Sequence, residues 1–423
     1  MISWKVYRPL QRVMVILFGL LLAVPVRAGE PRLAKSDLFA AGEGGHKLYR
    51  IPGIVVTAKG SILAYCEARK HTGLDWDDSE ILLRRSTDGG QTWSEPKALP
   101  RPAGKLERNP AAVAKKLARE GEITFDNPVA IVARDGAVHF LYCVDYGRCF
   151  YLRSDDDGAT FSQPVEITRT FEQFRTDFDC RVFATGPAHG IQLKSGRLVV
   201  PVWLSTGTGG NAHRPSVVAT IGSDDGGRTW QRGEIVANAT DPLIDPNETV
   251  AVQLADGRVM LNIRSESKQH RRAIGFSPDG LTHWARPVFD EQLKEPICMA
   301  SLCRLSEQGK SDRNRLLFAN PDNLDRGDEK ESRGRMQARK NLTVKLSYDE
   351  GQTWPVSRVL EPGTSGYSDL AVGRDGTIYC LYERGSTDGK DHFATRSLTL
   401  ARFNLEWLSD GKDRLAKAEQ AEQ

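Results

Sequence analysis

Three arginines occupy places where a strand is expected to exclude charge. They are Arg50, which lies inside the apolar strand predicted at 49–56, Arg264, which ends the run 259–263, and Arg339, which lies just before the strand predicted at 342–346. A buried guanidinium group needs an anion, so for each arginine alone a structural ion pair is the simplest interpretation. Three such arginines at similar places relative to predicted hairpins instead indicate one shared anionic ligand. A guanidinium group can hold a carboxylate through two parallel hydrogen bonds.

An eight-residue pattern recurs along the chain and predicts the fold that would bring these arginines together. Its four good copies read STDGGQTW, SDDDGATF, SDDGGRTW and SYDEGQTW, and they begin at Ser86, Ser154, Ser223 and Ser347. The Asp can accept hydrogen bonds from backbone N–H groups ahead of it, and the Gly supplies a positive φ, as is typical of a tight hairpin turn. One copy would indicate only a common surface turn, whereas four copies indicate a structural repeat.

The spacing of the copies predicts the architecture. With a weaker copy at Ser277 included, successive copies start 68, 69, 54 and 70 residues apart. One hairpin per period of this length is typical of a propeller with four-stranded blades. These periods, together with the chain before the first copy or after the last, predict an all-β fold. We expect a six-bladed β-propeller of four-stranded antiparallel blades, whose loops meet at one end of the axis.

Three segments depart from the regular strand pattern. Residues 111–120 are rich in Ala, Lys and Arg and predict a short helix inserted between blades. Residues 306–340 carry many charges and few apolar side chains, which predicts a long surface loop. Residues 67–78 form a polar loop in which Trp76 is expected to be exposed.

The ordered motifs of the chain resemble those of the bacterial exo-α-sialidases, the neuraminidase family of Asp-box propellers. The resemblance rests on the repeated boxes and on segments that cover nearly all of the chain after residue 28. These segments are YRIP at 49–52, NE at 247–248, NIRS at 262–265, RKNLT at 339–343, GYSDL at 366–370 and LYE at 381–383. Each segment alone is a weak signal, but their order and spacing are specific.

The resemblance implies a role for each of nine residues. Arg50, Arg264 and Arg339 would hold the carboxylate of a sialic acid, Glu383 would brace Arg50, and Arg69 and Glu67 would line the same pocket. Tyr367 would be the nucleophile, Glu248 the base that activates it, and Asp75 the acid/base.

Two of these assignments have competitors nearby. Asp77 and Asp78 lie beside Asp75, and either could cap the loop, but the distance from Asp75 to the arginine pair at 84–85 fits the family pattern. Arg333 and Arg335 compete with Arg339, whose position before the segment 341–343 decides in its favour.

The residue types suit the chemistry that the resemblance implies. Sialic acid carries a carboxylate on its anomeric carbon, so a carboxylate nucleophile would meet a like charge. A neutral phenol avoids this repulsion, but its pKa near 10 means that it needs a base beside it. Sialidases with a tyrosine nucleophile are an established exception to the two-carboxylate rule of glycosidases. The reaction would be retaining, with Asp75 first protonating the leaving oxygen and then activating water.

The N-terminal segment has the features of an export signal. Three basic residues precede an apolar run at 13–26 that is short for a membrane span, and Val26-Arg27-Ala28 is a small-x-small cleavage site. We expect residues 1–28 to be a signal peptide, residues 29–405 a catalytic propeller and residues 406–423 a charged tail. This tail could be a terminal helix, but a solvated end is the simpler interpretation. The protein would then be secreted or periplasmic, with no membrane span after cleavage.

The composition of the chain gives information on nucleic-acid binding, metal binding and disulfides. A net charge of +3 without a long basic run gives no indication of nucleic-acid binding. We expect no cofactor and no metal, and His189 and His213 are interpreted as loop or core residues. The seven cysteines contain two close pairs, 143/149 and 298/303, which could bridge or remain buried thiols.

Two other functions compete with hydrolysis of terminal sialic acids on glycoproteins, glycolipids or oligosaccharides. A non-catalytic Asp-box propeller that binds glycan or protein would keep the repeated turns, but it is expected to have lost part of the catalytic set, and no member of that set is lost here. A hydrolase of a related nonulosonic acid would keep the set and differ in the side chains around the C5 substituent.

Overall fold

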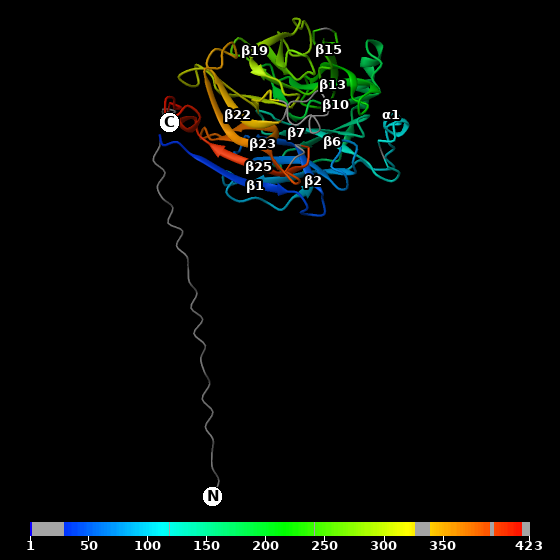
Figure 1. Cartoon of the computed structure of the whole chain (residues 1–423), viewed down its shortest axis with the longest axis horizontal. Coiled ribbons are helices and arrows are strands. Elements are labelled where there is room, and N and C mark those ends of the chain that lie inside the picture. The colour runs from blue at the N-terminus through cyan, green and yellow to red at the C-terminus, as the bar shows by residue number, and fades with distance from the viewer. Residues whose placement is uncertain (2–28, 118, 241, 326–338, 390–392, 417–423) are drawn as a thin grey trace.

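The computed structural model describes residues 1, 29–117, 119–240, 242–325, 339–389 and 393–416. In these residues most regular structure is β-strand, and the sheets follow one another in a propeller-like arrangement (Figure 1). The expected all-β class is therefore confirmed. The predicted signal peptide lies outside the described residues apart from Met1.

The first two sheets supply the N-terminal half of the site. One follows the chain order and contains β2 (Leu48–Val56), β3 (Ile62–Arg69), β4 (Ser79–Ser86) and β5 (Lys97–Ala98). The other contains β6 (Phe125–Val132), β7 (Val138–Val144), β8 (Arg148–Ser154) and β9 (Val165–Glu166), and β11 (Ala188–His189) pairs in parallel with β6.

The next two sheets continue the same pattern. One contains β10 (Val182–Thr185), β13 (Leu198–Gly209), β14 (Arg214–Ser223) and β15 (Gln231–Ala237), with β12 (Ile191–Gln192) also on β13. The other contains β16 (Thr249–Gln253), β17 (Val259–Ile263), β18 (Arg271–Ser277) and β19 (Val288–Lys294).

The last sheet has seven strands and joins the two ends of the described chain. Its order is β1-β25-β24-β23-β22-β21-β20. The strands are β1 (Leu33–Ala40), β20 (Ser301–Ser306), β21 (Arg315–Pro321), β22 (Lys340–Ser347), β23 (Val356–Val372), β24 (Ile378–Ser386) and β25 (Thr395–Phe403). The strand nearest the N-terminus thus pairs antiparallel with the last strand, which closes the arrangement.

Every copy of the repeated pattern lies at the same place in its sheet, directly after the third of four consecutive strands. In the first copy the Asp88 carboxylate accepts the backbone N–H of Thr92 at 2.9 Å and its hydroxyl at 2.6 Å, while Ser86 Oγ accepts the N–H of Gly90 at 2.9 Å. The copy that begins at Ser154 repeats this pattern. The turn chemistry expected from the sequence is therefore present.

Short helices connect some of the strands. They are α1 (Pro110–Ala114), α2 (Thr168–Glu172), η1 (Gln173–Thr176) and α3 (Leu405–Leu408). The helix predicted over residues 111–120 is therefore shorter than expected, since the chain turns at Lys116, whose φ is +55°. Among the described helices, none combines the length and the apolar character that crossing a membrane requires.

Two expectations about surface segments were wrong in part. The segment 306–340 contains β21, which is buried along its whole length, because four consecutive apolar residues pack inward and the Arg315 charge is paired with Asp312 and Asp413. Residues 326–338 of that segment lie outside the described residues. The tail expected from residue 406 begins inside α3, where Trp407 and Leu408 are buried against the sheet.

Candidate active site

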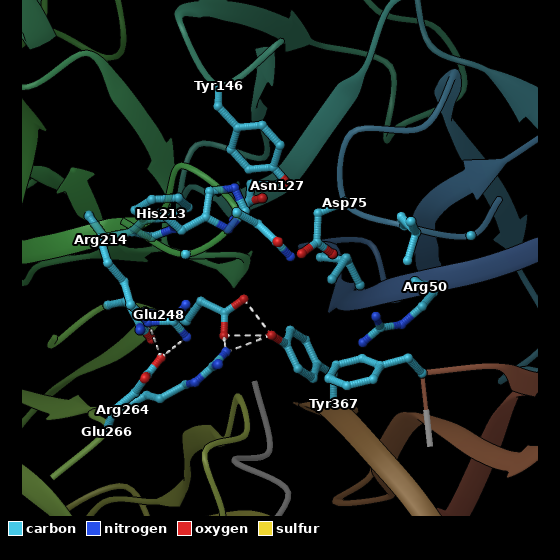
Figure 2. Close-up of a pocket in the computed structure, with 18 of the residues that line it drawn as sticks. Arg50, Asp75, Asn127, Tyr146, His213, Arg214, Glu248, Arg264, Glu266 and Tyr367 are labelled. Atoms are coloured by element: carbon cyan, nitrogen blue, oxygen red, sulfur yellow. Dashed lines mark hydrogen bonds and ion pairs between the residues drawn. The ribbon is translucent and has the colours of Figure 1, made fainter. Parts of the chain in front are cut away.

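A cavity of about 450 Å³ gathers residues from several sheets. Its wall includes all three arginines singled out in the sequence, Arg50, Arg264 and Arg339, and also Arg69, Asp75, Glu248 and Tyr367. Figure 2 shows Arg50, Arg264, Asp75, Glu248 and Tyr367 facing this cavity. Glu67 and Glu383 lie behind this wall, where each bonds an arginine of the cavity. The propeller thus brings together residues that are more than three hundred positions apart in the sequence.

Irregular backbone aims two of these side chains. The pairing of β2 with β3 shifts register between Arg50 and Gly53, and Ile51 adopts a φ of +58°. A β-branched residue in the left-handed region costs on the order of 1–3 kcal/mol, a strain typical of functional sites. The pairing of β23 with β24 shifts register around Tyr367 as well. Such bulges re-aim side chains and end regular pairing.

Glu383 on β24 fixes both of these irregular segments. Its carboxylate accepts two hydrogen bonds from Arg50, at 2.8 Å from Nε and 3.2 Å from Nη2. It also accepts the backbone N–H groups of Ile51 at 3.3 Å and Tyr367 at 3.1 Å. One buried carboxylate therefore neutralises Arg50 and holds the backbone at Tyr367.

Tyr367, Glu248 and Arg264 form a buried cluster. The Tyr367 hydroxyl lies 2.6 and 2.7 Å from the two Glu248 carboxylate oxygens and accepts a hydrogen bond of 2.7 Å from Arg264 Nη1 (Figure 2). Arg264 also pairs with Glu248 directly. Burial raises the pKa of the Tyr367 phenol, and the charges of Arg264, Arg339 and Arg50 oppose that rise only in part. The phenol is therefore protonated at neutral pH and can donate its proton to Glu248.

Positive charge surrounds the Tyr367 ring without being fully neutralised. The guanidinium carbons of Arg50, Arg264 and Arg339 lie 5.3, 5.9 and 5.1 Å from the ring centre. Arg339 is 2% exposed, and within the described residues its Nε and Nη1 have no hydrogen-bond partner, although Nη2 donates to the Ile297 carbonyl. Arg264 Nε has none either in that part of the chain. These free donors make the cavity ready to bind an anion.

Asp75 enters the cavity from the loop between β3 and β4. Its carboxylate accepts a hydrogen bond of 3.1 Å from Arg69 Nη1, and Arg69 in turn bonds Glu67 at 2.7 and 3.0 Å. Burial alone would raise the pKa of Asp75, but the charges of Arg69 and Arg50 and the hydrogen bond from Arg69 outweigh burial and lower that pKa. The carboxyl group of Asp75 is therefore ionised at neutral pH.

An aromatic wall that the sequence did not indicate lies next to Asp75. His213 packs against Trp76, Tyr146 and Trp203, with ring centres 5.7, 4.8 and 5.2 Å away. Burial, together with nearby arginines, lowers the pKa of His213 to about 4, so its imidazole is neutral. The expected loop or core role for His213 was therefore incomplete, because it lines the cavity.

The expectation that Trp76 is exposed was wrong. The Trp76 side chain is 4% exposed, because its indole N–H bonds the Asn211 carbonyl at 2.8 Å and its ring packs on Tyr146. Phe393 is a further lining residue that the sequence did not indicate, and it stacks on Arg50 and Arg339. His189 lies elsewhere, where Nδ1 is 2.7 Å from Asp369.

The described residues show neither a metal-binding cluster nor a disulfide. The described residues contain no group of three or more His, Cys, Asp and Glu side chains arranged to hold a metal ion. All seven cysteines are free thiols, including Cys143 and Cys149, which face each other across β7 and β8.

Family models match most of the propeller. The model described as "BNR repeat-like domain" matches residues 108–380, and the model described as "BNR/Asp-box repeat" matches residues 84–95. A curated sialidase of Micromonospora viridifaciens is 31% identical over 412 residues, which covers 90% of this chain. The chain spans 55% of the length of that relative.

Solved structures share the fold. The Hadza microbial sialidase Hz136 matches with a TM-score of 0.69 at 25% identity, covering 88% of this chain and 69% of that protein. The intramolecular trans-sialidase from Ruminococcus gnavus, solved with oseltamivir carboxylate, matches with a TM-score of 0.67 at 17% identity, covering 88% of this chain and 98% of that protein. At this lower identity the second match is evidence for the fold alone.

Proposed function

The chain belongs to the exo-sialidase family with BNR repeats, and we propose that it hydrolyses terminal α-linked sialic acids on glycoproteins, glycolipids or oligosaccharides. One observation carries the proposal. The Tyr367 hydroxyl touches Glu248 while three guanidinium groups surround the Tyr367 ring. A phenol with a base beside it and unsatisfied cations around it matches a sugar whose reacting carbon bears a carboxylate.

The arginine cluster would hold the sugar by its carboxylate. Arg339 and Arg264 have unbonded guanidinium nitrogens among the described residues, so an incoming carboxylate would satisfy them. Arg50 keeps Nη1 for the ligand, since Glu383 takes only its Nε and Nη2. Such charge-assisted hydrogen bonds are about twice as strong as neutral ones and would fix the anomeric carbon above the phenol.

The first chemical step would form a sugar–tyrosine bond. Glu248 takes the Tyr367 proton as the phenolic oxygen bonds to the anomeric carbon, and the glycosidic carbon–oxygen bond breaks. Asp75 supplies a proton to the departing oxygen. In the second step Asp75 takes a proton from water, whose oxygen displaces Tyr367 from the same face that the leaving group occupied, and Glu248 returns the phenolic proton. Two displacements give net retention.

Asp75 must acquire a proton before it can act as an acid. Its pKa is lowered, because the charges of Arg69 and Arg50 and the hydrogen bond from Arg69 outweigh burial. A bound carboxylate would offset part of that positive charge and exclude water, and both effects raise the pKa of Asp75. We therefore expect kcat/KM to fall as pH rises, because the protonated fraction of Asp75 falls with it.

We also propose that the propeller has six blades. The first part of β23 pairs with β22 up to Thr364, and its second part pairs with β24 from Ser365. Dividing the seven-stranded sheet at this point yields two four-stranded units, which makes six with the other four sheets. Residues 29–405 would form this domain, and residues 1–28 would be cleaved on export, leaving a secreted or periplasmic protein whose mature N-terminus can be sequenced.

The function is tested with the purified protein and a sialoside that has a chromogenic leaving group. Turnover by the wild-type protein, lost in Tyr367→Phe while a sialic acid analogue still binds, supports the proposal. Binding without turnover in the wild-type protein would instead support a non-catalytic propeller. Mass spectrometry of the product separates free sialic acid from a transfer or intramolecular product, and a deaminated substrate tests the related nonulosonic acids.

A further inference from the structure

The loop that carries Asp75 is held in shape by a neighbouring carboxylate. We propose that Asp77 is a positioning residue, which fixes Asp75 where it can protonate the leaving oxygen. This inference rests on the proposed function. Asp77 is 2% exposed and does not line the cavity, so any effect on the reaction must pass through the loop.

The contacts of Asp77 are those of a loop clamp. Its Oδ2 accepts three consecutive backbone N–H groups, from His71 at 3.0 Å, Thr72 at 2.7 Å and Gly73 at 2.7 Å. Its own backbone N–H donates to the Leu74 carbonyl at 3.2 Å. A carboxylate that gathers three N–H groups fixes the turn through charge-assisted bonds, which a neutral amide forms less strongly. Asp75 lies between this turn and Asp77 itself, so its backbone is held from both sides.

Trp76 anchors the other side of Asp75 to a different sheet. Its indole N–H donates to the Asn211 carbonyl at 2.8 Å, at the tip between β13 and β14, and its ring packs 4.7 Å from that of Tyr146. Its own carbonyl accepts a hydrogen bond of 2.9 Å from Arg108. The residues on both sides of Asp75 are thus fixed by buried contacts.

Arg69 connects the backbone of the loop to the carboxyl group of Asp75. Its Nη1 donates to the Gly73 carbonyl at 2.9 Å and to Asp75 at 3.1 Å. Gly73 has a φ of +76°, and a Cβ there would lie 2.2 Å from the Leu48 side chain, so this tightly packed turn requires glycine at that position. If the Asp77 clamp loosens, Gly73 and Asp75 move relative to Arg69, whereas Arg50, Arg264 and Arg339 keep their own partners.

Displacing Asp75, the proposed acid, changes the relative rates on two substrates, whereas a general loss of stability lowers both rates alike. A leaving group such as an aryl alcohol departs without much protonation, whereas the sugar hydroxyl of sialyllactose requires it. A misplacement of about 1 Å can cost on the order of 10²-fold in rate. Asp77→Asn should therefore lower kcat/KM for sialyllactose by roughly 10²-fold and kcat/KM for an aryl sialoside by only about threefold.

The experiment compares kcat/KM for both substrates in the wild-type protein, Asp75→Asn, Asp77→Asn and Asp78→Asn. Asp75→Asn gives the reference pattern for loss of the acid. Asp78→Asn is the matched control, because Asp78 bonds the Lys70 ammonium at 3.0 Å and its side chain makes no bond to the loop backbone in the described residues. The control is expected to keep the wild-type ratio between the two substrates.

Different results would reject the role of Asp77 and the sialidase function. Equal losses on both substrates in Asp77→Asn, with the control unchanged, would overturn the positioning role while leaving the sialidase function intact. A wild-type protein inactive on both substrates would reject the function, and the inference would fall with it. If Asp77→Asn does not fold, Trp76→Phe is used instead, because it keeps an aromatic ring beside Tyr146 and removes the indole N–H bond to the Asn211 carbonyl. It must show the same selective loss on sialyllactose for the inference to stand.

Discussion

Replacing Arg339 with methionine should weaken ligand binding without weakening the fold. Arg339 is 2% exposed, and its Nε and Nη1 lack partners among the described residues, so burying its charge costs free energy. That cost is several kcal/mol for a buried ion without a counter-ion. Methionine has no charge, and it replaces the aliphatic stem of the arginine.

Arg339→Met also removes favourable interactions, and their total free energy is similar to the burial cost that the substitution relieves. The charged hydrogen bond to the Ile297 carbonyl contributes about 1.5–3 kcal/mol, and the contacts with the rings of Tyr367 and Phe393 contribute roughly 1 kcal/mol each. The free energy of unfolding should therefore change by no more than about 1 kcal/mol or should increase. Binding of a sialic acid analogue should weaken by about 2–5 kcal/mol, which is roughly 30-fold to several thousand-fold in Kd.

Arg50→Met is the matched comparison. Arg50 is equally buried, but Glu383 pairs with it through two hydrogen bonds. Its removal leaves a buried carboxylate without a cation, which costs about 3–5 kcal/mol of folding free energy. The two variants should therefore lose binding alike and differ in stability by about 3 kcal/mol.

Urea unfolding of both variants without ligand, and calorimetric titration with a sialic acid analogue, measure these quantities. If Arg339→Met is destabilised as much as Arg50→Met, Arg339 is a satisfied structural group and the account of an anion-ready cluster is wrong. If Arg339→Met binds the analogue as tightly as the wild-type protein, the ligand carboxylate does not lie on this cluster.

Two further predictions concern a base and a buried ion pair. Glu248→Gln should lower kcat by about 10²–10⁴-fold while the Kd of the analogue stays nearly unchanged, as steady-state kinetics and calorimetry would measure; unchanged kcat would exclude Glu248 as the base. Burial lowers the pKa of His189, but the charge of Asp369 outweighs burial and raises that pKa overall. The His189–Asp369 ion pair therefore stabilises the fold below pH ~6.5, and this stabilisation is lost as pH rises through the raised pKa of His189. Urea unfolding between pH 6 and pH 9 should show a smaller fall in stability for His189→Gln than for the wild-type protein, and equal falls would contradict this role.

The repeated turns made the fold class predictable. The motif from Ser86 to Trp93 contains the hydrogen-bonding groups of its turn, and a local pattern of this kind does not depend on distant residues. The strand β21 was missed because its charge at Arg315 is neutralised by Asp312 and Asp413, the latter 98 residues away along the chain. A sequence pattern cannot reveal a partner that only the closed fold brings near.

Some site residues could be predicted from the sequence, and others could not. Arg50 and Arg264 could be found because charge interrupts or ends an apolar run, whereas Arg339 was selected by its position before the segment 341–343. The structure brings all three to the Tyr367 ring. His213 gave no such signal, because it lies in an irregular segment between β13 and β14 and reaches the cavity only through the sheet order. Ile51 gave none either, since nothing in its residue type indicates a φ of +58°.

Covalent trapping tests the central claim most directly. A 2,3-difluorosialic acid, in which fluorine slows breakdown of a sugar–enzyme bond, is incubated with the wild-type protein, and the digested protein is mapped by mass spectrometry. We predict one added sugar, carried by the peptide that contains Tyr367 and absent in Tyr367→Phe. A sugar attached to any other side chain, or rapid turnover of an unlabelled protein whose Tyr367→Phe variant is equally active, would contradict the account.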